Sequence, residues 1–264
     1  MRRTCLHNYC DANLNQYETV DFRKISKDVR IFFKFSNEKY ILTDKIISII
    51  RPRKTFSVLD VGCGEGYVVR KLYDQVKNCT ALDPNQKMLE RLRKNVKNNP
   101  KVIFVNKKLQ DFETDEEFDI TLSSHTLSFF EDKRQAIDRM LDLTKNGGKL
   151  ILVLHCQASE QLRMLKEINL AIEKREIKHV YAEALRCYLT DKGFEPKLEG
   201  IETLASFPSF EALSKLSYFL FRIDYDRLDY QNREFIRIYM EKKRRNNSFE
   251  IRTLHGIISV TKNH

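Results

Sequence analysis

Three glycines at alternate positions, Gly62, Gly64 and Gly66, follow an acidic residue, Asp60. The hydrophobic segment 56–61 before them is typical of a buried strand, and an amphipathic helix is predicted after them. A strand, a glycine turn and a helix bring backbone N–H groups against a ligand, and glycine is needed where a side chain would block that approach. The spacing differs from the G-x-G-x-x-G pattern of dinucleotide-binding turns. A turn that serves only sheet packing is the alternative.

A second carboxylate, Asp83, ends the next hydrophobic segment. It lies 83 − 62 = 21 residues after Gly62, close to the ~20 residues expected for a ribose-binding carboxylate at the end of a second strand. A carboxylate accepts strong hydrogen bonds from both ribose hydroxyls. Pro84 is predicted to open the following helix, because its missing N–H costs nothing there. A plain helix N-cap at Asp83 remains the alternative.

Together these residues resemble the first motifs of class I S-adenosylmethionine-dependent methyltransferases. The resemblance covers about 56–155 and also includes Phe118-Asp119 and Gly147-Gly148. It implies S-adenosylmethionine as the cofactor, with the ammonium of its amino-acid moiety near a carboxylate. The implied cofactor-binding residues from these segments are Asp60, Gly62, Cys63, Gly64, Gly66, Asp83, Pro84 and Ser124.

The adenine contact departs from the pattern of this class. Many relatives have Gly-Asp-Ala after the third strand, whereas this chain has a different sequence over 106–112. Either Asp111 or Gln110 is expected to replace the missing aspartate. Met88 is expected either to give adenine an apolar face or to be an ordinary core residue of its helix.

The predicted fold is α/β: a Rossmann-like, seven-stranded, doubly wound sheet with an antiparallel last strand. Residues 1–264 are expected to form a single methyltransferase domain, of which 1–20 are expected to be mobile. Within it we expect an N-terminal helical cap over 1–50, a cofactor-binding core over 56–155 and a helical lid over 206–250 between the last two strands. The predicted strands are 56–61, 79–82, 102–105, 118–122, 149–154, 194–205 and 252–262.

As a whole, the chain is similar to the small-molecule enzymes grouped with histamine N-methyltransferase. That resemblance implies an acceptor set. Glu38 falls where the group has a substrate-binding glutamate, His125 where it has a glutamine, and Arg252 where it has an asparagine. Glu38 and His125 are thus the catalytic candidates. His125 is either a base or orienting group or a capping histidine, and Arg252 either pairs with an acceptor carboxylate or is a surface cation.

Composition restricts the partners. The chain has 264 residues and a net charge of +10, but its cations are mixed with acids except at 242–245, which is predicted to be a solvated helix end. Six cysteines without a C-x-x-C pair indicate neither a metal site nor a disulfide framework. No run of about 18 apolar residues and no N-terminal signal core are present, so no membrane contact is expected. Cysteines in predicted strands suit a reducing compartment, so a cytoplasmic protein is expected. Nucleic acid is not the expected partner, and a monomer or weak dimer is expected.

The predicted activity is methyl transfer to a small molecule, at the nitrogen of an amine or imidazole. The run Ser123-Ser124-His125-Thr126-Leu127 lacks the Asn/Asp-Pro-Pro-aromatic pattern of enzymes that methylate base amino groups, and no Pro-Cys nucleophile is present. Methylation of RNA or protein is nevertheless an alternative. The other alternative is a homologue that binds the cofactor but does not catalyse methyl transfer.

Overall fold

The computed structural model describes residues 13–263. It contains one mixed sheet in the order β3-β2-β1-β4-β5-β8-β6, with the short β7 paired to β8. The prediction of a doubly wound sheet is confirmed, with one short strand more than expected. The strands are β1 (Ser57–Val61), β2 (Asn78–Leu82), β3 (Val102–Val105), β4 (Phe118–Ser124), β5 (Thr144–His155), β6 (Lys197–Phe207), β7 (Arg244–Arg245) and β8 (Ser248–Thr261).

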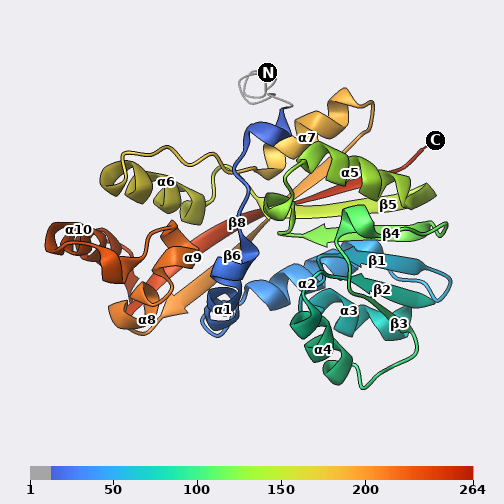
Figure 1. The fold of residues 1–264 in the computed structure, drawn as a ribbon, viewed down its shortest axis with the longest axis horizontal. Coiled ribbons are helices and arrows are strands. Elements are labelled where there is room, and N and C mark those ends of the chain that lie inside the picture. Colours follow the sequence, from blue (N-terminus) through green and yellow to red (C-terminus); the bar gives the residue numbers. More distant parts are fainter. Residues whose placement is uncertain (1–12, 264) are drawn as a thin grey trace.

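Strand direction changes only at the end of the chain. β1 is parallel to β2 and β4, and β4 is parallel to β5. β8 is antiparallel to β5 and to β6, with Leu152 opposite Ile258 and Thr203 opposite Thr253. β8 and β6 extend past the other strands toward α8, α9 and α10 (Figure 1). The predicted antiparallel last strand is therefore confirmed.

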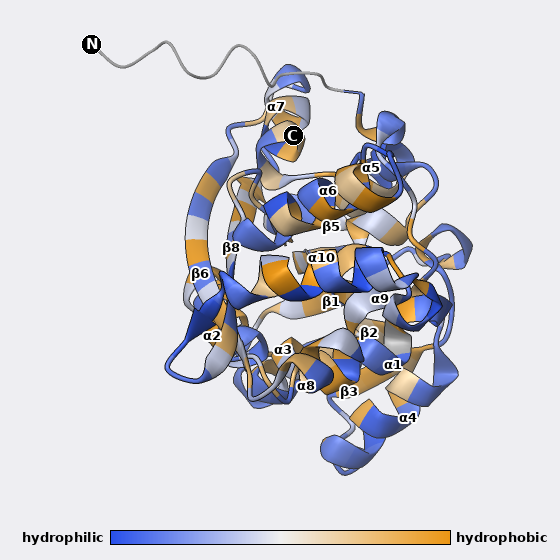
Figure 2. Cartoon of the chain, turned by 90° about the vertical axis from the view of Figure 1, so that its left-hand side faces the viewer, coloured by the Kyte–Doolittle hydropathy of each residue, from blue (hydrophilic) through white to orange (hydrophobic). Residues whose placement is uncertain are grey.

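Helices cover both faces of the sheet, because the inner strands are apolar on both sides. One buried cluster joins the sheet to α5 and α7, and a second joins the other face to α2, α3 and α4. Figure 2 shows these layers from the side of α10, with α5 and α7 above the strands and α3 and α4 below them. The helices are α1 (Phe22–Phe32), α2 (Glu38–Ile50), α3 (Tyr67–Leu72), α4 (Gln86–Asn95), α5 (Lys133–Asp142), α6 (Glu160–Ile172), α7 (Ala182–Asp191), α8 (Phe210–Ser214), α9 (Ser217–Phe221) and α10 (Tyr230–Glu241).

The helical insertion lies between β6 and β8, where it was expected. Its helices α8, α9 and α10 pack around the ends of these strands, with Phe221 and Ile236 fully buried. Most of its aromatic residues thus belong to a core, which was the simpler of the two expectations. Two residues of the insertion, Phe219 and Arg222, also line the cavity described below.

The N-terminal cap is two helices, not one. The chain leaves helical geometry at 33–37, where Ser36 forms a bridge with Ala205 of β6. The Asn37 side chain accepts a hydrogen bond from the Leu204 amide at 2.9 Å, and Ser36 Oγ accepts one from the Glu38 amide at 3.1 Å. This anchored break makes Glu38 the first residue of α2.

A buried lysine holds the segment that leads into the cap. Lys133, at the start of α5, is fully buried and donates to Tyr17 O, Thr19 Oγ1 and Phe130 O at 3.0–3.3 Å. The amide of Val20 also donates to Ser128 O at 2.8 Å. The expectation that 1–20 are mobile is therefore wrong for 13–20, and residues 1–12 lie outside the described residues.

The basic run 242–245 is only partly a solvated helix end. It follows α10, but two of its residues form β7. Lys243 is mostly covered and forms a 2.5 Å ion pair with Glu160 of α6. The run therefore helps to join the insertion to α6.

None of the helices among residues 13–263 combines the length and the apolar character that a membrane crossing requires.

Candidate functional site

The glycine turn lies where β1 ends, as predicted. The amides of Gly62 and Cys63 both donate to Leu82 O of β2, at 2.7 and 3.2 Å. Gly62, Gly64 and Gly66 have φ values of +70°, +55° and +69°. A Cβ on Gly62 would overlap Thr126, and one on Gly66 would overlap Leu92, whereas a Cβ on Gly64 would meet nothing within 4 Å. The close approach of Thr126 and Leu92 therefore requires glycine at 62 and 66, and Gly64 leaves free space beside the loop.

Asp83 joins this loop to the end of β2. One carboxylate oxygen accepts from the Gly64 amide at 2.8 Å, and the other accepts from the Asn85 amide at 2.7 Å. Asn85, not Asp83, is the N-cap of α4, and the helix begins at Gln86. The prediction that Pro84 opens the helix is therefore wrong, and so is the N-cap alternative for Asp83. Each carboxylate oxygen keeps a lone pair for a ribose hydroxyl.

Asp60 is a buried carboxyl beside the turn. It is only 4 % exposed, and burial together with the charge of Asp83 raises its pKa to about 7. A buried carboxylate without a cation is costly, because desolvation penalises the charged form. Asp60 is thus suited to a cationic partner such as an ammonium group.

The residues expected to contact adenine come from two elements outside the glycine turn, the helix α4 and a short helix after β3. Met88 is almost buried in α4, with its sulfur 3.8 Å from an Arg91 guanidinium nitrogen, and Gln110 and Asp111 are exposed in the short helix η4 (Leu109–Asp111). None of the three lines the cavity that begins at the glycine turn. Their roles toward adenine remain predictions.

Two other motif segments hold the core together. Asp119 Oδ2 accepts from the amide and hydroxyl of Ser57 and from Lys145 Nζ, at 2.8–3.0 Å. It thereby ties β4 to the start of β1. A Cβ on Gly148 would come within 3 Å of the carbonyl oxygens of Lys145 and Asp119. These segments therefore stabilise the sheet rather than contact the ligand.

A single cavity of about 230 Å³ runs from the glycine turn to the N-terminal cap. Asp60, Gly62, Cys63 and Ser124 line one part of it, and Glu38 and His125 line another. A volume of this size suits one small molecule. Other residues in its wall come from α1, α9 and the loop before α7: Phe22, Val29, His179, Val180, Phe219 and Arg222.

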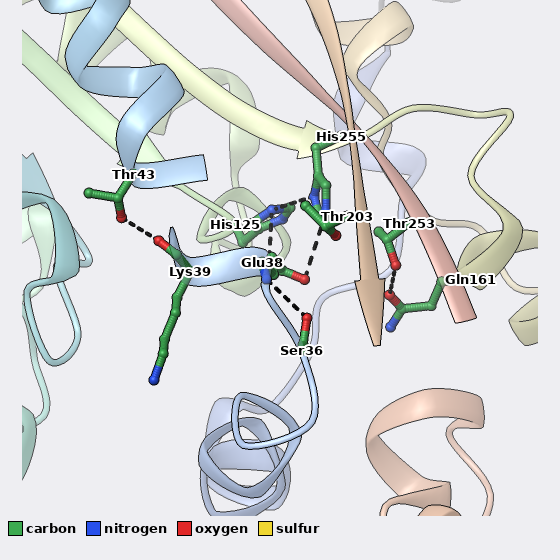
Figure 3. A network of polar contacts seen from close by, with 9 residues as sticks. All are labelled: Ser36, Glu38, Lys39, Thr43, His125, Gln161, Thr203, Thr253 and His255. Carbon is green, nitrogen blue, oxygen red and sulfur yellow. Dashed lines mark hydrogen bonds and ion pairs between the residues drawn. The ribbon is translucent and has the colours of Figure 1, made fainter. Parts of the chain in front are cut away.

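Glu38 and His125 meet as the resemblance implied. Their nearest carboxylate oxygen and Nε2 atom are 4.0 Å apart. His125 Nε2 is also 3.0 Å from Nδ1 of His255, whose Nε2 is 2.8 Å from Thr203 Oγ1 (Figure 3). Burial raises the pKa of Glu38 to about 8 and lowers that of His125 to about 4. The Glu38–His125 contact is therefore an uncharged one at neutral pH in the absence of a ligand.

The sequence interpretation missed three functional candidates in this cavity. His155 is the last residue of β5, His179 stacks on it with ring centroids 5.7 Å apart, and Arg222 lies just after α9. Nδ1 of His155 and one guanidinium nitrogen of Arg222 are buried without a hydrogen-bond partner among the described residues. The signal for His155 was its position at the carboxyl end of a predicted strand. No sequence pattern indicated a functional role for His179 or Arg222.

Arg252 does not reach this site. Its side chain is exposed and forms a 2.8 Å ion pair with Glu202 on the neighbouring strand. Thr253 and His255 are buried while Arg252 is exposed, because side chains alternate along β8. The prediction that Arg252 contacts the acceptor is therefore corrected: it is the surface cation of the alternative.

Comparison with known proteins agrees with this geometry. Residues 59–152 match the family model described as a methyltransferase domain. The chain is 27% identical over 162 residues to a tRNA U34 carboxymethyltransferase of Aliivibrio fischeri, covering 57% of this chain and 48% of that protein. It is 21% identical over 131 residues to malonyl-[acyl-carrier protein] O-methyltransferase 1 of Ilyobacter polytropus, covering 48% and 49%. The chain thus spans about half the length of these curated relatives.

A solved structure covers more of the chain. It is a SAM-dependent methyltransferase of Thermotoga maritima, described as a possible histamine N-methyltransferase. It superposes with a TM-score of 0.55 at 16% identity over 91% of this chain and 97% of that one, and at this identity the likeness concerns the fold. The family match supports a methyltransferase core with S-adenosylmethionine as its cofactor, and the solved structure supports the fold of that core.

The glycine turn yields a paired test. We expect Gly64→Ala to fold with a modest loss of stability, because its Cβ meets nothing and only the positive φ costs about 1–2 kcal/mol. It should lose S-adenosylmethionine binding, because the Cβ fills the space beside the loop. Gly66→Ala should lose about 1–3 kcal/mol more stability through overpacking against Leu92. Thermal unfolding and calorimetry with the cofactor measure both. Unchanged affinity in Gly64→Ala would contradict this reading of the loop.

Asp60 makes cofactor affinity depend on pH. Its pKa of about 7 means that the carboxylate fraction falls below neutral pH. We therefore expect the affinity for S-adenosylmethionine to weaken roughly 10- to 30-fold between about pH 7.5 and about pH 5.5. Without a ligand the sign is opposite: the raised pKa favours the folded state at low pH, and this contribution is lost as pH rises toward 7. Asp60→Asn should bind weakly at both pH values and lack most of this slope, and an equal slope in the variant would refute the assignment.

Proposed function

We propose that this protein transfers the methyl group of S-adenosylmethionine to a nitrogen atom of a small molecule, an amine or an imidazole. The observation that carries the proposal is the shared cavity, which is lined both by Asp60 and Gly62 and by Glu38 and His125. The first pair suits the amino-acid end of the cofactor, and the second suits an acceptor that offers N–H groups. The similar protein described as a possible histamine N-methyltransferase supports this choice of acceptor.

The chemistry needs positioning more than activation. The acceptor nitrogen supplies the electron pair for the new N–C bond, and the S–C bond breaks with its electrons remaining on sulfur as the thioether. Positive charge passes from sulfur to nitrogen, and the proton exchange that completes the balance takes place with solvent after the methylated product leaves the cavity. Because the donor is already activated, holding the two reactants in line and excluding water supply the catalysis. Phe22 and Val29 of α1, together with Phe219, close the cavity from one side.

Glu38 is the residue that favours a nitrogen acceptor. It lies 11 % exposed at the start of α2, with its backbone held by Ser36. Its carboxyl group accepts hydrogen bonds in either protonation state, so it orients an N–H group without requiring a cation. His125 borders the same space and contacts the acceptor from the β4 side.

Arg222 indicates which further group the acceptor carries. The sequence interpretation assigned an anionic substituent of the acceptor to Arg252, and Arg222 is the arginine that lines the cavity. Burial lowers its pKa, and one of its guanidinium nitrogens has no hydrogen-bond partner within residues 13–263. A buried donor left unpaired costs free energy, and a carboxylate on the acceptor would satisfy it. We therefore infer an amine or imidazole that also carries an anionic group.

Two assays test the proposed function in sequence. Calorimetry should show S-adenosylmethionine binding, and a transfer assay with labelled cofactor should show methylation of amines and imidazoles, best when they carry a carboxylate. Transfer RNA and malonyl-carrier protein, the substrates in the names of the curated relatives, form separate arms of the panel. Preferential methylation of either would refute the small-molecule acceptor. Binding without transfer to any member would favour the non-catalytic alternative.

The two arginines form a matched pair. We expect Arg222→Gln to raise the KM for a carboxylate-bearing acceptor roughly 10- to 100-fold, the loss of a charge-assisted hydrogen bond of about 1.5–3 kcal/mol. Acceptors without the carboxylate should be little affected. Arg252→Gln should leave both KM values within about twofold, because Arg252 is an exposed side chain paired with Glu202. Steady-state kinetics measures these KM values, and an equal change of KM in the two variants would contradict the role of Arg222.

A further inference from the structure

Three histidines from different strands converge at the inner end of the cavity. His125 follows β4, His155 ends β5, and His255 lies in β8 directly opposite His155. Their ring centroids are 4.8–5.3 Å apart, and one ring nitrogen from each lies within 4.8 Å of the others. Three buried imidazoles at such distances are unusual for a purely structural core, where apolar side chains pack more favourably.

The backbone aims these rings at one another. His155 and His255 are opposite residues of an antiparallel pair, so their side chains leave the sheet on the same face. His125 has a φ of +57°, uncommon for a residue other than glycine, while its amide donates to Val153 O of β5 at 2.9 Å. This left-handed turn at the end of β4 directs the His125 ring toward the other two. Strained backbone of this kind persists where the surroundings impose it, often at functional sites.

The hydrogen bonds leave ring nitrogens available inside the cluster. His255 Nε2 is paired with Thr203 Oγ1, so its Nδ1 faces His125 Nε2 at 3.0 Å. Nδ1 of His155 is buried and has no hydrogen-bond partner among the described residues. Such a nitrogen keeps its lone pair or its proton free for a ligand. Burial lowers the pKa values of all three rings, and neutral imidazole is the form that binds metals.

We propose that His125, His155 and His255 form a binding site for a divalent transition-metal ion, Zn²⁺ by preference. Zinc is bound by imidazole nitrogens at about 2.0–2.1 Å in a tetrahedral site, which places the nitrogens roughly 3.3 Å apart. The His125–His255 pair already has nearly this spacing. A ring nitrogen of His155 lies within 4.8 Å of both, so this ring has to move closer to share the ion. Imidazole ligands without thiolates favour zinc and its neighbours over magnesium or calcium.

The surroundings complete such a site. Glu38 lies 3.7–4.0 Å from the imidazole nitrogens of His255 and His125 and balances the charge of a cation. Thr203 orients His255, as partners of metal-bound histidines commonly do. His125 and His155 line the cavity, so the fourth tetrahedral position faces the space assigned to the acceptor. Three protein ligands and one open position are the arrangement of a catalytic zinc rather than a structural one.

The test measures metal binding, not methyl transfer. Untagged full-length protein, stripped with a chelator, is titrated with Zn²⁺ in a calorimeter. Co²⁺ is then added as a spectroscopic probe, whose visible absorption reports tetrahedral nitrogen coordination. We expect one Zn²⁺ per chain and the Co²⁺ bands. His155→Asn should weaken the affinity at least about 100-fold, beyond the 10–100-fold typical of outer partners. The variant should still fold, because Nδ1 of His155 has no hydrogen-bond partner to lose in the part of the chain that the structure describes.

His179→Asn is the matched control. His179 stacks on His155 and lines the same cavity, but it is outside the group of three. This variant should keep Zn²⁺ affinity within a few-fold, and His255→Asn should behave like His155→Asn. The proposal would be overturned if the native protein did not bind Zn²⁺ stoichiometrically or if all variants bound it with equal affinity. Equal losses of affinity in His155→Asn and His179→Asn would also overturn it. Calorimetry of the stripped protein with S-adenosylmethionine tests the proposed function separately, because Asp60 and the glycine loop do not belong to the histidine cluster.

Discussion

Parallel pairing of the inner strands is the constraint on which the rest of this structure depends. In register, Val61 lies beside Leu82 and Ser124 beside Val153, so β1, β2, β4 and β5 end at one edge of the sheet. The residues that follow these strands are Gly62, Asp83, His125 and Cys156. They therefore lie side by side at the carboxyl edge of the sheet, where ligands bind in open α/β sheets. Hydrogen bonds from the Gly62 and Cys63 amides to Leu82 O and from the Gly64 amide to Asp83 then fix the loop against β2.

The antiparallel β8 has a different consequence. By pairing with β5 it brings His255, from near the end of the chain, beside His155. By extending past the core it carries β6 with it, and β6 in turn holds the break between α1 and α2 through Ser36 and Asn37. The position of Glu38 thus depends on residues more than 160 positions away, a consequence of long-range sheet pairing.

Burial sets the electrostatic character of the site. Asp60 and Glu38 have raised pKa values, and the cavity histidines have lowered ones, with desolvation as the leading cause in each case. Without a ligand the cavity therefore holds few full charges, although its residues are ionisable. A cationic cofactor end beside Asp60, or a metal cation among the histidines, would supply the charge that these groups are arranged to balance.

The sequence by itself determined the central sheet and the cofactor loop, because both rest on local patterns. Hydrophobic runs marked β1 to β5 within a few residues, and the positions of Asp60, Gly62, Gly64 and Asp83 followed from short-range spacing. Glu38 and His125 came from a family resemblance, and the structure brings them together. Tertiary structure alone decided the grouping of His155 and His255, the presence of Arg222 in the cavity wall and the exclusion of Arg252. Which face of β8 is buried depends on the helices α6 and α7 that pack against it, and no local pattern around Arg252 encodes those contacts.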